Sequence, residues 1–122
     1  MKALMFLLGF LLLASTAHGE SAVLTWVDNS GNSPSINDQE TGFIIERQLN
    51  GGAWNSLGTT LPNVVTYTDN TLVAGSTDNR YCYRVSATNT AGTSAPSPVA
   101  CKTITAVVVI VIPPAASNLV AK

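Results

Sequence analysis

Histidine and cysteine are both rare in this sequence, which has one histidine, His18, and two cysteines among its 122 residues. His18 lies in an N-terminal stretch with the layout of a cleaved leader, so the rest of the chain has no imidazole for a general base, a catalytic triad or a metal site. The seven acidic residues are scattered, and no glycine-rich phosphate loop follows a strand-like segment and opens a helix. We therefore expect a protein that is not an enzyme and that needs no cofactor or metal.

Basic residues are also scarce and do not cluster. Beyond residue 19, five Lys and Arg residues face seven Asp and Glu residues, which leaves a net charge of −2. Nucleic-acid binding needs grouped Lys and Arg to neutralise phosphates. We expect no nucleic-acid partner. The sequence contains no Asn-x-Ser/Thr sequon either, so N-glycosylation is not expected.

The N-terminal apolar run, Leu4 to Ala14, is too short for a membrane span, which needs about 20 apolar residues. Lys2 precedes this run, and small residues that suit a cleavage site follow it. This layout predicts a secretory signal peptide over residues 1–19, in preference to a membrane anchor. We expect a secreted, periplasmic or cell-surface protein with no transmembrane segment in the mature chain. Oxidising conditions outside the cytoplasm favour pairing of the two cysteines.

Four short segments alternate between apolar and other residues with a period of two, which is typical of strands with one buried face. They are Ala22–Trp26, Gly42–Arg47, Val65–Thr68 and Tyr81–Ala87. Turn-forming residues separate them, and beyond the leader no 3.6-residue stripe is long enough for a helix. The pattern predicts one small all-β domain, a sandwich or a barrel.

The Asn50-Gly51 pair predicts a tight hairpin between residues 47 and 57, because both residues tolerate positive φ. A second hairpin places the two cysteines together. Folding the chain back about Ala91-Gly92 sets residue 88 opposite residue 95 and Cys82 opposite Cys101.

Opposed Cβ atoms in an antiparallel pair lie about 4.5–5.5 Å apart, close to what a disulfide requires. We predict a Cys82–Cys101 disulfide that stabilises the domain by about 3 kcal/mol. The alternation turns Tyr81 and Tyr83 toward the core, so Cys82 faces outward. The alternative, a redox pair, is less favoured because Arg84 is the only cation nearby.

These segments together resemble a fibronectin type III domain over about residues 21–105. The matching stretches are Leu24-Thr25-Trp26, Gly42–Arg47, Gly51–Trp54, Thr66–Asp69 and, most specifically, Tyr83–Gly92 followed by Ser94-Ala95-Pro96-Ser97. The resemblance implies an immunoglobulin-like two-sheet sandwich. Its strands would lie at 22–27, 42–48, 53–58, 64–68, 80–88 and 95–105, in a domain of residues 20–105.

The resemblance also implies roles for single residues. Trp26 would lie at the centre of the core. Tyr81 looks like the tyrosine-corner residue, whose hydroxyl bonds back to the preceding loop. With the alternation, the predicted core is Trp26, Phe43, Ile45, Tyr67, Leu72, Tyr81, Tyr83 and Val85.

The first strand of the fibronectin type III pattern is missing ahead of residue 22. Residues 106–122, an apolar and proline-containing linker, instead end in Pro113-Pro114-Ala115-Ala116-Ser117-Asn118-Leu119-Val120-Ala121, which looks like the first strand of a next repeat. Four interpretations stay open: a piece of a longer repeat array, a tail that folds back onto strand 22–27, a tail donated to another molecule, and a disordered tail. The apolar run Ala106–Ile112 is either a stiff extension of the last strand or a pairing surface for another chain.

Fold alone does not fix function. We expect a non-catalytic exported module that acts as a spacer, a repeat or an adhesion module, with further repeats, a polysaccharide or a cell-surface protein as its partner. The alternatives are a carbohydrate- or protein-binding module that uses Trp54 and the loops, and self-assembly through the C-terminal tail. Trp54 either offers a platform for a ligand or packs within its hairpin.

Overall fold

The computed structural model describes residues 19–30 and 39–122. The predicted signal peptide therefore lies outside the described residues, except for its last residue, and so do residues 31–38. Within the described residues the chain forms strands, turns and irregular segments and no helix, so no helix there is long and apolar enough to cross a membrane.

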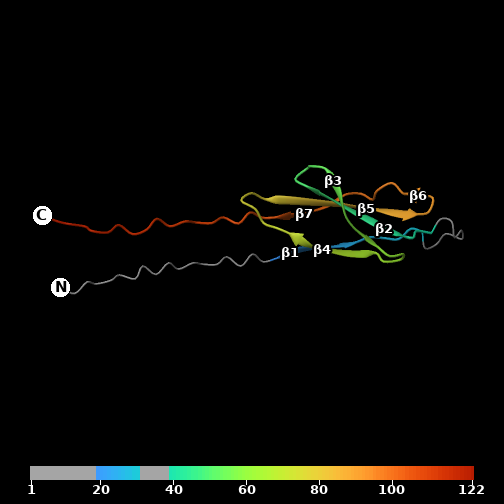
Figure 1. The fold of residues 1–122 in the computed structure, drawn as a ribbon, viewed down its shortest axis with the longest axis horizontal. Helices are drawn as coiled ribbons and strands as arrows, with labels where there is room; N and C mark the ends of the chain where they lie inside the picture. The colour runs from blue at the N-terminus through green and yellow to red at the C-terminus, as the bar shows by residue number, and fades with distance from the viewer. Residues whose placement is uncertain (1–18, 31–38) are drawn as a thin grey trace.

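The strands form two antiparallel sheets that pack as a sandwich (Figure 1). The smaller sheet pairs β1 (Glu20–Thr25) with β4 (Thr66–Leu72). The larger sheet has the order β3-β2-β5-β6, and β7 also pairs with β5. Its members are β2 (Gly42–Leu49), β3 (Trp54–Thr60), β5 (Asn79–Asn89), β6 (Gly92–Thr93) and β7 (Ala100–Ile104). This arrangement confirms the predicted immunoglobulin-like two-sheet sandwich.

Five of the predicted strands exist with shifted ends, but the last one, predicted over 95–105, is wrong as a continuous strand. Only β7 forms within that range, because residues 94–99 are irregular, and the short strand β6 lies before it. Cys82 faces Cys101 as predicted, whereas Thr88 faces Thr93 and not residue 95. The reason is that Pro96 and Pro98 lack the amide hydrogens that a regular ladder needs.

Two serine side chains replace part of the ladder in segment 94–99. The Ser94 hydroxyl accepts a hydrogen bond from the Ala87 amide, and the Ser97 hydroxyl accepts one from the Val85 amide, each at 3.0 Å. The amide groups of the same two serines donate to the carbonyls of Ala87 and Val85 at 2.8 Å. The inner strand β5 thus keeps its hydrogen bonds although its neighbour is irregular.

The hairpin between β2 and β3 turns where the sequence predicts it. Asn50 and Gly51 have φ values of 49° and 74°, the positive pair that a two-residue hairpin turn requires. The Gly52 amide donates to the Leu49 carbonyl at 2.9 Å and closes the turn.

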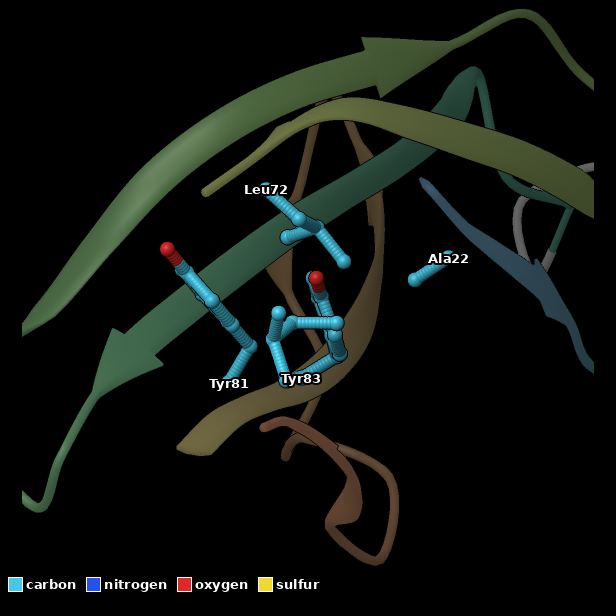
Figure 2. Close-up of a cluster of buried hydrophobic side chains, with 5 residues drawn as sticks. Ala22, Leu72, Tyr81 and Tyr83 are labelled. Carbon is cyan, nitrogen blue, oxygen red and sulfur yellow. The ribbon is translucent and has the colours of Figure 1, made fainter. Parts of the chain in front are cut away.

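The core lies between the two sheets around Tyr81 and Tyr83 (Figure 2). Five of the predicted core residues are buried: Phe43, Ile45, Leu72, Tyr81 and Tyr83. Ala22 and Ile104 are also buried and were not predicted as core residues. The other three predicted core residues, Trp26, Tyr67 and Val85, are only half-buried. Trp26 and Val85 are left half-buried because they line a side of the sandwich that no strand of the described ranges covers.

Tyr81 makes the predicted tyrosine corner. Its hydroxyl donates to the Val73 carbonyl at 3.3 Å and accepts from the Val73 amide at 3.2 Å. This contact ties the start of β5 to the loop that follows β4. The corner forms although the loop contains no proline between Leu72 and Tyr81.

The C-terminal tail forms no strand beyond Ile104 and runs away from the sheets (Figure 1). Two hydrogen bonds direct its start: the Ala106 amide donates to the Asp78 carboxylate at 2.8 Å, and the Val107 amide donates to the Gly75 carbonyl at 3.1 Å. A fold-back of the tail onto strand 22–27 is therefore not the arrangement that this structure has.

Candidate functional site: an open strand edge and its groove

The outer edge of β1 is open. On its inner side β1 pairs with β4, and among the described residues no strand pairs with its other side. The Trp26 amide donates to the Val65 carbonyl at 3.1 Å. Because main-chain groups point alternately to the two sides of an antiparallel strand, Leu24 and Trp26 direct theirs to β4. Val23 and Thr25 therefore direct their amide and carbonyl groups to the open side.

A groove runs along this open edge, between β1 and the segment that leads into β7. It consists of adjoining hollows, and the largest, at the Trp26 end, has a volume of about 630 Å³. Its lining is mainly apolar, with side chains from both sheets: Ala22, Leu24, Trp26, Tyr83, Val85, Pro96, Pro98 and Ala100. The groove is thus an exposed part of the sandwich interior.

Trp26 stands at the wide end of the groove. Its ring meets the Phe43 ring edge-on, with 5.4 Å between the ring centroids. The indole N–H is buried and has no hydrogen-bond acceptor among the described residues. A buried donor without an acceptor is unusual in folded proteins. The wide end of the groove thus contains a donor group, the indole N–H, whose hydrogen-bonding capacity is unused among the described residues.

Lys102 closes the narrow end of the groove. It lies on β7, and its ammonium group donates to the Ser21 carbonyl at 2.5 Å and lies 3.6 Å from the Glu20 carboxylate. The open edge therefore begins after Ser21. From Ala22 to Val27, β1 and the residues just after it carry no charge and no proline.

Taken together, an unpaired edge beside an apolar groove can bind an extended peptide. Main-chain groups of the edge would hold its backbone, and the groove would hold alternate side chains. Reasoning from the sequence identified the missing first strand but did not locate this groove, because its far wall is the irregular segment 94–99.

Trp54, the predicted ligand platform, lies on the opposite face of the larger sheet. The guanidinium group of Arg84 covers its ring at 4.4 Å from the centroid, and Arg84 is paired with Glu46 at 2.6 Å. Trp54 itself is half-buried. The contact with Arg84 favours the packing interpretation of Trp54, because one ring face is already occupied.

The disulfide between Cys82 and Cys101 is confirmed, and no cysteine is free. It lies on the outer face of the larger sheet, in the row that Trp54 and Gln48 continue across β3 and β2. Cys82 is nevertheless buried, because its neighbours in this row cover it, whereas Cys101 is exposed.

An ion pair lies in the interior, opposite the groove residues. Arg47 on β2 donates to the Asp69 carboxylate on β4 at 2.8 Å, and the Tyr83 hydroxyl donates to the same carboxylate at 3.0 Å. Burial raises the pKa of Asp69, but hydrogen bonds from Thr71, Arg47 and Tyr83 outweigh it, so the pKa lies below its usual 3.8. Burial, and then the Asp69 carboxylate, raise the pKa of the Tyr83 hydroxyl far above its usual value.

Sequence reasoning missed this network. Its charged members, Arg47 and Asp69, look like ordinary surface residues, and only the strand parity of Arg47, which shares a face with Phe43 and Ile45, could have indicated it. Nothing in the network resembles a catalytic pair. Among the described residues no group of three His, Cys, Asp or Glu side chains could hold a metal ion.

Comparison with known proteins bears on the fold alone. No family model matches the sequence, and no curated protein matches it. A solved structure of the twitchin kinase region from C. elegans, described as Fn31-NL-kin-CRD-Ig26, is similar with a TM-score of 0.55 and 24% sequence identity. The similarity covers 73% of this chain and 14% of the twitchin chain. It supports an immunoglobulin-like sandwich for this chain and carries no information on activity.

Proposed function

We propose that this protein is an exported, non-catalytic module of the fibronectin type III kind, which acts as a spacer or adhesion module in a surface or secreted protein. The observation that carries the proposal is the two-sheet sandwich with its disulfide. Its longest strand, β5, is cross-linked to β7 by the disulfide, which is the type of bond that persists in oxidising compartments.

Several further features support a module without catalysis. The buried Asp69 carboxylate and the Tyr81 hydroxyl are engaged in structural hydrogen bonds. The tail leaves the sandwich as an extended segment, which suits the connection between neighbouring modules. The structural similarity to part of a protein that contains Fn3 and Ig modules agrees with a modular role.

Polysaccharide recognition through Trp54 is the less favoured alternative. A sugar-binding tryptophan presents a free ring face, whereas Arg84 covers one face of Trp54 and Glu46 fixes Arg84 in place. The contacts among Trp54, Arg84 and Glu46 favour packing of Trp54 on the outer face of the larger sheet over binding of a sugar.

The proposal is tested on the natural protein by cell fractionation followed by intact mass measurement without reduction. We expect the protein in the exported fraction, without residues 1–19 and two hydrogens lighter than the reduced chain. We also expect it to be carried by a polypeptide with further modules. A cytoplasmic protein that keeps residues 1–19 and has free thiols at Cys82 and Cys101 would contradict the proposal.

A further inference from the structure

An exposed strand-forming segment and an unpaired strand edge occur in the same molecule. The segment Ala106–Ile112 consists of seven uncharged apolar residues, mostly β-branched, and residues 107–112 each expose at least half of their surface. Such residues favour strands and are rarely left exposed in series. The open edge of β1 and its groove lack a strand of this kind.

Two of the other edges of the sandwich are protected against pairing. The edge formed by β6 and β7 is interrupted by Pro96 and Pro98, and a bulge between Ile45 and Glu46 distorts the pairing that holds the edge strand β3. The stretch Ala22–Val27 contains neither a proline nor a bulge. It exposes Val23 and Val27 at 68% and 78% of their surface. The outer edge of β4 has no strand partner among the described residues either, but the apolar groove runs along β1, so an apolar strand fits best at β1.

The direction of the chain decides which molecule supplies that strand. Lys102 contacts Ser21, so β7 ends beside the start of β1, and the tail leaves from that end. A tail that turned back into its own groove would run parallel to β1. The hydrogen bonds of Ala106 and Val107 also direct it outward. All strand pairs among the described residues are antiparallel, and antiparallel pairing with β1 requires a strand that enters at the Trp26 end.

A second copy meets this requirement when it lies in line with the first. Its tail leaves at its own Lys102 end and enters the next molecule at the Trp26 end, with both molecules pointing in the same direction. The five residues 108–112 span about 17 Å in extended form, and the six residues Ala22–Val27 of the open edge span about 20 Å, so the segment can cover most of this edge. Because the donor and acceptor surfaces differ, this contact is heterologous and does not close into a two-fold dimer.

We propose that residues 108–112 of one molecule, which follow the two anchored amides, add as an antiparallel strand to the open edge of β1 in a second copy, which builds a head-to-tail chain of domains. The apolar groove takes alternate side chains of the added segment, and the free amides and carbonyls of Val23 and Thr25 take its backbone. This inference goes beyond a spacer role, because it gives the domain a partner of its own kind.

The test separates donor from acceptor with two variants of the full exported chain. Thr25→Pro removes an amide that faces the open side, so it blocks the acceptor edge without removing a bond to β4. The double variant V108P/V109P removes an amide from each side of the donor segment. Val23→Lys provides a second acceptor variant at an exposed position, should Thr25→Pro fail to fold. Ser117→Pro is the matched control, because it introduces proline into the same tail beyond the donor segment.

Sedimentation equilibrium over a range of concentrations gives the result. We expect the mass of the wild type and of Ser117→Pro to rise to at least twice that of the monomer, and each blocked variant alone to stay monomeric. An equal mixture of an acceptor variant and V108P/V109P is expected to double in mass and to stop there, because it can form one junction. A wild type that stays monomeric, an acceptor variant that assembles alone, or a mixture that does not dimerise would overturn the proposal. None of these results touches export or catalysis, so the proposed function is decided separately.

Discussion

The Asp69 carboxylate on β4 lies 2.8 Å from the guanidinium group of Arg47 on β2, so one ion pair joins the two sheets through the interior. The Asp69 side chain is 1% exposed and the Arg47 side chain 28% exposed. The smaller sheet has only two strands among the described residues, and β1 has a strand neighbour on one side only. The ion pair fastens this small sheet to the larger one. The pair is therefore expected to matter more for stability than a surface pair.

Asp69→Asn is expected to lower the free energy of unfolding by about 3 kcal/mol, because it leaves the Arg47 charge in the interior without a counter-ion. The folded-state pKa of Asp69 lies below its usual 3.8, so its stabilisation is complete above the unfolded-state value and is lost as the pH falls through the folded-state value. Urea unfolding from about pH 7 to about pH 2 measures both effects. The acid dependence should be weaker in Asp69→Asn than in the wild type.

The neighbouring pair Glu46–Arg84 serves as the control. Both of its side chains are 27% exposed, and it lies on the outer face of the same sheet. Glu46→Gln is expected to cost less than about 1 kcal/mol. Equal costs for the two variants would contradict a special role for the interior pair.

Replacement of both cysteines, Cys82→Ala with Cys101→Ala, is expected to destabilise the domain by about 3 kcal/mol. The disulfide closes a sequence separation of 19 residues and restricts the unfolded chain. Thermal melting with and without reductant measures the effect. Reductant should bring the wild type to the melting temperature of the variant and leave the variant unchanged. A variant as stable as the oxidised wild type would show that the cross-link is dispensable.

Tyr81→Phe is expected to cost about 1–2 kcal/mol, because it removes a hydroxyl that both donates to and accepts from the Val73 backbone. Tyr67→Phe is the matched control. The Tyr67 hydroxyl has a single long contact, 3.4 Å to the Leu57 carbonyl, so its loss should cost clearly less. Chemical unfolding of both variants compares the two hydroxyls directly. A Tyr81→Phe variant as stable as the wild type would mean that the corner does not stabilise the loop.

Trp54→Ala is expected to reduce stability by about 1 kcal/mol, through lost burial and lost contact with Arg84, and to leave binding to polysaccharides unchanged. Co-sedimentation with insoluble cellulose and chitin, together with thermal melting, checks both statements. Arg84→Ala should resemble it in stability. Lost retention on either polysaccharide at unchanged stability would reverse the assignment and make Trp54 a ligand platform.

Local patterns predicted those parts of the fold that local chemistry controls. The alternation around Tyr81 and Tyr83 predicted the inner strand β5, Asn50-Gly51 predicted the turn between β2 and β3, and the hairpin register predicted the disulfide. The register failed in segment 94–99. There, serine hydroxyls take the place of main-chain acceptors and accept hydrogen bonds from β5. The prolines in the sequence suggest an interrupted strand, but they do not show which side chains replace the missing main-chain bonds.

The candidate site was harder to predict than the strands. The sequence indicated that a first strand is missing, because the strand signal begins at residue 22. It did not indicate that the resulting gap is lined by Tyr83 and Val85 of a distant strand, since that depends on how the two sheets pack. The Asp69–Arg47 pair was missed for the same reason.

The most direct measurement of the open edge is amide hydrogen exchange of the exported protein at low and at high concentration, read at single residues of β1. The amides of Val23 and Thr25 point away from β4, and the amide of Leu24 points toward it, so Leu24 is an internal reference. We predict that exchange at Val23 and Thr25 is fast in dilute protein and slows with concentration, while exchange at Leu24 is slow throughout. Equally fast exchange of Val23 and Thr25 at both concentrations would contradict the claim that this edge receives a strand from a second copy.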